Sequence, residues 1–118
     1  MKGSVLALPL PDEYADTVLF IETIEHLDSM YDVSNALDEI KRILKPNGKV
    51  IIAMPDFSSL AGRIMERLYG VFHPQAYADD HKVKMGVDSL EYLCTKKQLT
   101  LEDNINLLKR DVILRFSK

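Results

Sequence analysis

Apolar residues in the first half of the chain form two continuous runs separated by a helical stripe. The runs, 17–21 and 50–54, suit strands covered on both faces, as in a parallel sheet, and their β-branched residues favour a strand over a buried helical turn. Between them, apolar residues from 33 to 44 recur at helical spacing, with Asp32 placed to cap the helix and Pro46 unable to continue it. Strand, helix and strand with short connections predict a right-handed parallel crossover.

The middle of the chain predicts a second helix followed by an irregular segment. The helix begins near residue 58 or 59, and its apolar face includes Leu60, Ile64 and Leu68. Residues 73–86 have no clear period, which is typical of a loop or a lid.

The last third predicts a short helix and an antiparallel hairpin. Residues 88–91, Asp-Ser-Leu-Glu, resemble a capping box that opens the helix. Two stretches, 99–101 and 105–107, alternate as strands do, and 112–116 is a last strand. Because the connection at 109–111 is short, we expect the final two strands to pair antiparallel.

The composition predicts one globular domain spanning residues 1–118. Hydrophobic content of 47% and charged content of 28% are close to globular averages, and the length suffices for a single modest core. The formal net charge of −3 lacks the basic footprint of phosphate binding, so no nucleic-acid partner is expected.

The cysteine count and the lengths of the apolar runs indicate the cellular compartment. Cys94 is the one cysteine and has no partner for an intrachain disulfide, which fits a reduced, cytoplasmic setting. No apolar run approaches the roughly 20 residues that cross a bilayer, so no membrane span is expected. Pro9 and Pro11 interrupt the N-terminal apolar patch, which argues against a signal peptide.

Four features follow one another between residues 8 and 48: a proline-flanked acidic turn at 8–12, the strand at 16–21, Glu-His-Leu at 25–27, and a helix end with Leu-Lys-Pro-Asn-Gly at 44–48. In this order they resemble the second half of a class I S-adenosylmethionine-dependent methyltransferase of the group acting on small molecules. The resemblance implies an α/β fold. It would be a partial Rossmann-like sheet of parallel strands with crossover helices and a C-terminal antiparallel hairpin, lacking the N-terminal cofactor-binding strands.

The resemblance also implies S-adenosylmethionine as cofactor and a small-molecule acceptor. The family binds the cofactor mainly through a glycine-rich turn, and here that motif is absent because all five glycines are isolated. The positions comparable to cofactor contacts are Ser4, Leu8 and Glu22. We therefore expect a gene fragment, a partial chain, or a chain completed by another polypeptide.

The candidate site residues follow the ends of the two predicted parallel strands. Open α/β sheets bind ligands at that edge. Glu22, Glu25 and His26 follow the first strand, and a carboxylate or imidazole there could take a proton from an acceptor. For His26, a structural role in bracing the following loop is slightly favoured over proton transfer. The acceptor-pocket candidates are Glu25, His26, Met54, Asp56 and Phe57. No catalytic residue is assigned, because alignment with the sulfonium can supply much of the rate.

Asp79, Asp80 and His81 are adjacent on a loop and are interpreted as solvated, so no metal site is expected. The first strand lacks a partner on its far side, which predicts a homodimer or a complementary chain at this exposed edge, unless residues 1–8 fold back over it. The alternative to a methyltransferase is a non-catalytic remnant or interaction module that keeps the half-fold without cofactor binding.

Overall fold

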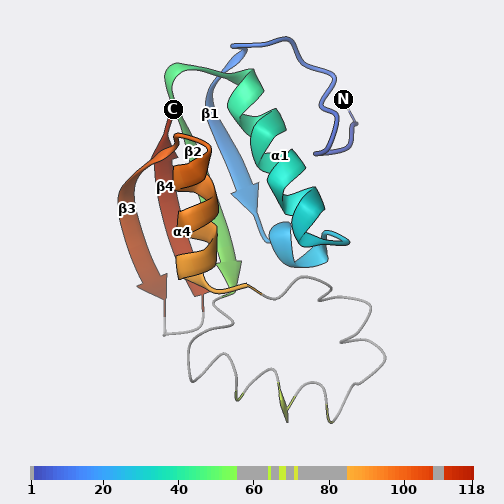
Figure 1. The fold of residues 1–118 in the computed structure, drawn as a ribbon, viewed down its shortest axis with the longest axis vertical. Coiled ribbons are helices and arrows are strands. Elements are labelled where there is room, and N and C mark those ends of the chain that lie inside the picture. Colours follow the sequence, from blue (N-terminus) through green and yellow to red (C-terminus); the bar gives the residue numbers. More distant parts are fainter. Residues whose placement is uncertain (1, 56–63, 65–66, 69–70, 72–84, 108–110) are drawn as a thin grey trace.

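A four-stranded mixed sheet carries the described part of the chain (Figure 1). The computed structural model describes residues 2–55, 64, 67, 68, 71, 85–107 and 111–118. The elements are β1 (Ala15–Ile21), the 3-10 turn η1 (Ile24–His26), α1 (Met30–Ile43), β2 (Leu44–Pro55), α4 (Val87–Lys96), β3 (Thr100–Leu107) and β4 (Asp111–Ser117). The helix predicted from residue 58 or 59 falls largely, and the predicted loop or lid at 73–86 almost wholly, outside the described residues.

The sheet order is β1-β2-β4-β3, and it contains both predicted pairings, β1 with β2 and β3 with β4. β1 and β2 pair in parallel, with Ile21 opposite Ala53, and α1 provides the crossover between them. β4 runs antiparallel to β2 and to β3, so the last two strands form the expected hairpin. The two stretches predicted around residues 100 and 106 are one strand, β3, with an irregularity in register between Leu101 and Asp103.

Both predicted helix caps are wrong in their details. The N-cap of α1 is Ser29, whose side chain accepts a hydrogen bond from the backbone N–H of Asp32 at 3.2 Å. Asp32 is therefore inside the first turn, where its charge suits the positive end of the helix dipole. α4 begins after Gly86 without a side-chain cap, so Asp88 is likewise within the first turn and opens no capping box.

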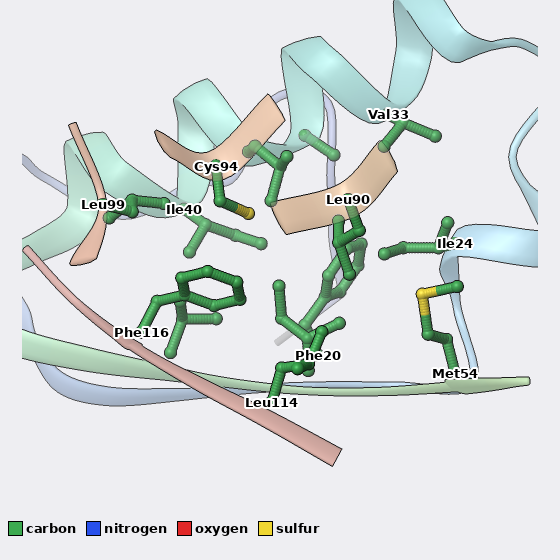
Figure 2. Close-up of a cluster of buried hydrophobic side chains, with 14 of the residues drawn as sticks. Phe20, Ile24, Val33, Ile40, Met54, Leu90, Cys94, Leu99, Leu114 and Phe116 are labelled. Carbon is green, nitrogen blue, oxygen red and sulfur yellow. The ribbon is translucent and has the colours of Figure 1, made fainter. Parts of the chain in front are cut away.

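The core lies between the sheet and the two helices, which cover the same face (Figures 1 and 2). Strand residues such as Phe20 and Phe116 meet helix residues such as Ile40 and Leu90, all almost completely buried. Each such side chain contributes about 1.5–3 kcal/mol on burial. Cys94 belongs to this core, and burial raises the pKa of its thiol to about 12, so it acts as a small apolar residue.

The other face of the sheet is not covered within the described residues, which corrects the expectation of strands enclosed on both sides. Burial alternates along β2 and β4 rather than continuing through them. On β1, Leu19 and Ile21 are 64% and 50% exposed, and Ile105 on β3 is also exposed. The two apolar runs do form strands, but the sheet face opposite the helices is not packed against any described part of the chain.

β1 forms one edge of this sheet, and β2 is its single strand partner among the described residues. Residues 2–8 do not add a strand there, so the alternative of a fold-back over the edge is not found. Instead, the N-terminal segment runs beside α1 (Figure 1). No helix in the described part of the chain is long and apolar enough to cross a membrane.

Candidate active site at the carboxyl edge of β1 and β2

The chain leaves β1 through an unusual backbone conformation at Glu22. This residue has a φ of 50°, in the left-handed region that costs an ordinary residue roughly 1–2 kcal/mol. Its N–H nevertheless donates to the Ala53 carbonyl at 2.9 Å, which keeps the turn attached to β2. The Thr23 hydroxyl then donates back to the Ile21 carbonyl at 2.8 Å. An exposed carboxylate is thereby held at the strand's end.

The following turn, η1, separates a core residue from two candidate site residues. Ile24 is almost fully buried and packs in the core near Met54 (Figure 2). Insertion of Ile24 carries Glu25 inward, so that its side chain is only 2% exposed, whereas that of His26 is half exposed. The two remain neighbours, with Glu25 Oε1 lying 3.8 Å from His26 Nε2.

The buried carboxyl of Glu25 is electrostatically unusual. Its Oε2 atom is buried without a hydrogen-bond partner. Burial raises the pKa of Glu25, and the nearby Glu22 carboxylate raises it further, against the opposing effects of its own backbone N–H and of His26. Burial thus favours the protonated form of this carboxyl group more than it would in a solvated glutamate.

The residues predicted to contact the cofactor from the N-terminal segment lie elsewhere. Leu8 is fixed to Glu39 and Arg42, in the C-terminal half of α1. Because a helix rises about 1.5 Å per residue, Glu39 is about 14 Å along the axis from Met30, where α1 begins beside η1. Ser4 is exposed in a short turn that it closes with Ala7. The described structure therefore does not bring Leu8 together with Glu22.

The candidates that follow β2 divide into one core residue and two that are not described. Met54 is fully buried on the helix-facing side of the sheet. Asp56 and Phe57 lie outside the described residues, as do Asp79, Asp80 and His81. Among the residues that are described, no group of three His, Cys, Asp or Glu side chains is arranged to hold a metal ion.

Two hollows formed by described residues are lined by none of these candidates. One, of about 130 Å³, is on the uncovered sheet face and is lined by Ile51, Asp103, Ile105, Ile113 and Arg115. The other is an open depression of about 450 Å³ between α1 and α4, lined by Met30, Asp88, Ser89, Tyr92 and Leu93. We give more weight to the carboxyl edge, because the perturbed carboxyl group lies there.

Sequence reasoning missed the pair Glu39 and Arg42. On a helix surface both resemble ordinary solvated charges, and the structure shows them bonded to the backbone of residues 8–10. Their spacing of three residues, which places them on one side of the helix, is the signal that could have drawn attention to them.

A parallel strand pair joined by a crossover helix, with acidic side chains where the strands end, defines an open α/β sheet of the Rossmann-like class. Residues 1–52 match the family model of a methyltransferase domain. The whole chain also superposes on a Thermotoga maritima S-adenosylmethionine-dependent methyltransferase, a possible histamine N-methyltransferase. The TM-score is 0.76 and the identity 24%, with 63% of that protein covered.

Two sequence relatives match parts of the chain. A probable S-adenosylmethionine-dependent methyltransferase of Mycolicibacterium smegmatis is 35% identical over 54 residues, which are 46% of this chain and 20% of that protein. An uncharacterized protein of Methanocaldococcus jannaschii is 32% identical over 81 residues, which are 69% of this chain and 34% of that protein. The matched part of the chain thus spans about a third of the length of one relative and a fifth of the other. The first 52 residues of the chain thus match a methyltransferase domain, and its fold is that of S-adenosylmethionine-dependent methyltransferases.

Proposed function

We propose that this chain forms the acceptor-side wall of a site that transfers a methyl group from S-adenosylmethionine to a small molecule. The observation that carries the proposal is the cluster of Glu22, Glu25 and His26 at the carboxyl end of β1, beside the end of β2. In an open α/β sheet this edge is where ligands bind.

The residues of this edge fit the charge of the cofactor. S-adenosylmethionine supplies an electrophilic methyl group on a positively charged sulfur, and the exposed Glu22 carboxylate offers a negative charge at the strand's end. Glu25 lies at the same edge, and in its ionised form its side chain is able to accept a proton from an acceptor oxygen or nitrogen. Alignment of acceptor and methyl group can supply much of the rate.

The opposite wall of the pocket is proposed to come from polypeptide that packs against β1. The glycines of this chain, at 3, 48, 62, 70 and 86, do not form a glycine-rich turn. The exposed edge and face of β1 offer backbone and apolar surface for a further strand. A second copy or a complementary chain would satisfy that surface.

Calorimetric titration with S-adenosylhomocysteine tests this function. It is performed on the chain alone and on the assembly purified from its native cells through a tag on the chain. We expect Glu22→Gln to weaken binding, whereas Asp16→Asn, which makes the same charge change at the other end of β1, should leave it unchanged. Absence of binding in both preparations would instead support the second candidate, a non-catalytic module that retains the half-fold.

A further inference from the structure

The open depression between α1 and α4 has the size of a small-molecule site. Its volume is about 450 Å³, within the range in which proteins bind small ligands. One wall is Met30, the first residue of α1. The other wall belongs to the first part of α4 and consists of Asp88, Ser89, Tyr92 and Leu93. Two helices that are far apart in the sequence thus enclose one hollow.

The core beneath α4 fixes the orientation of this second wall. At about 100° per residue, the four lining residues of α4 lie within about 140° of arc on one side of the helix. Leu90 and Cys94 lie on the adjoining arc, and both are completely buried between the helices and the sheet (Figure 2). The depression therefore exists in the folded chain without any ligand.

The larger side chains of the depression suit a flat apolar ring. Met30 is 47% exposed and Tyr92 is 64% exposed, so apolar surface on both walls faces solvent. A thioether and a phenol ring both contact aromatic groups favourably. Lys96 Nζ lies 5.3 Å from the centroid of the Tyr92 ring, within the range of a cation–π interaction. The ring is thus accessible and attracts positive charge.

The charge of the depression is negative where the two helices begin. Among the described residues that line it, Asp88 is the single charged group, and its side chain is exposed. Asp28 and Asp32 lie two positions before and after the first residue of α1. Within α4 the first cation is Lys96, about 12 Å further along the helix axis than Asp88. A positively charged group at the Asp88 end complements this distribution.

The depression also lies close to the candidate active site. Figure 1 shows that α1 and α4 both begin at the end of the sheet where β1 and β2 finish. Met30 follows His26 by four residues, so their Cα atoms are at most about 14 Å apart. From Asp88 to Leu93 the second wall continues for about 8 Å along α4. A small molecule lying in the depression therefore has one end near the candidate site.

We propose that this depression binds the part of the acceptor that is not methylated, and that the acceptor is an aromatic compound with a positive charge. Its ring lies between Met30 and Tyr92, and its charge lies beside Asp88. The inference rests on the proposed function, because it names the acceptor class of that same site. Asp88 and Tyr92 are then specificity-determining residues and take no part in methyl transfer.

Two probes with the same ring and opposite charge test this inference: phenethylamine, which ends in an ammonium group, and hydrocinnamate, which ends in a carboxylate. Their dissociation constants are measured by calorimetry with S-adenosylhomocysteine present, on the chain alone and on its native assembly. We expect phenethylamine to bind about fivefold more tightly, since an ion pair that stays exposed is weak. The methyl resonance of Met30 should shift on binding, because the probe ring lies beside it.

Matched variants separate the charge from the ring. Asp88→Asn should remove the preference for phenethylamine, whereas Asp16→Asn, the same change on β1, should keep it. Tyr92→Ala should weaken both probes by the same factor, about fivefold, because a ring contact is lost. Tyr14→Ala, which removes another exposed tyrosine, should weaken neither.

The outcomes distinguish this inference from the proposed function. Equal affinity for the two probes in the wild type, or a preference that persists in Asp88→Asn, would overturn the inference. Binding of S-adenosylhomocysteine without binding of phenethylamine would overturn the inference and leave the proposed function standing. Binding of phenethylamine without any binding of S-adenosylhomocysteine, in the chain or its assembly, would refute the proposed function and with it the acceptor role of the depression.

Discussion

Replacing Glu25 with glutamine should remove a pH-dependent loss in the free energy of unfolding. The folded-state pKa of Glu25 is raised above 4.5, so stability is fully present below pH 4.5 and is lost as pH rises through the folded-state value. Once ionised, the side chain has a buried oxygen without a partner, which costs about 1–3 kcal/mol. For a domain of this size, 1 kcal/mol corresponds to about 4 °C in melting temperature.

Urea unfolding followed by circular dichroism at pH 5, 6, 7 and 8 measures this effect. We expect the free energy of unfolding of the wild type to fall relative to that of Glu25→Gln as pH rises. Glu22 and His26 face the same carboxyl group, so Glu22→Gln should reduce the slope and keep its sign. Asp16→Asn serves as an exposed control. A Glu25→Gln variant that is less stable than the wild type at pH 8 would show that the carboxylate is well paired, against this reasoning.

Three further predictions concern the fold and its open edge. Phe116→Ala should lower the free energy of unfolding by about 3–5 kcal/mol in urea titrations, because the ring is completely buried. Ser29→Ala should cost about 1 kcal/mol in the same assay, and equal losses in Ser29→Ala and Asp32→Ala would contradict the observed cap. Leu19→Lys with Ile21→Lys should reduce self-association in light scattering at tens of micromolar; a wild type that is already monomeric there would refute the predicted pairing through β1.

The order of strands and helices was predictable because each depended on a local pattern. As neighbouring strands with a crossover helix, the two apolar runs and the stripe between them contribute to one core. The helix caps were less predictable, since Ser29 and Asp32 are both good acceptors and the backbone at Ser29, with φ of −158°, decides between them.

The position of the candidate site in the fold was predictable from the sequence, but the burial of its side chains was not. That Glu22, Glu25 and His26 follow a strand is evident from the sequence, whereas the burial of Glu25 follows from the insertion of Ile24 into the core. Recognition of Arg42 required the path of residues 8–12, which have no periodicity. A charged residue on a helix gives no local sign of the carbonyl groups that it will meet.

The exposed strand and the candidate site are the same part of the molecule, and this has a thermodynamic consequence. Glu22 follows directly from Ile21, the last residue of the edge strand β1 and one of its most exposed apolar residues. A polypeptide that pairs with β1 and covers this face would therefore also approach the carboxylates. Cofactor binding and association would then be linked, so that each strengthens the other by the same factor. S-adenosylhomocysteine should thus lower the dissociation constant of the assembly, and an assembly whose affinity is unchanged by saturating ligand would place the cofactor site away from β1.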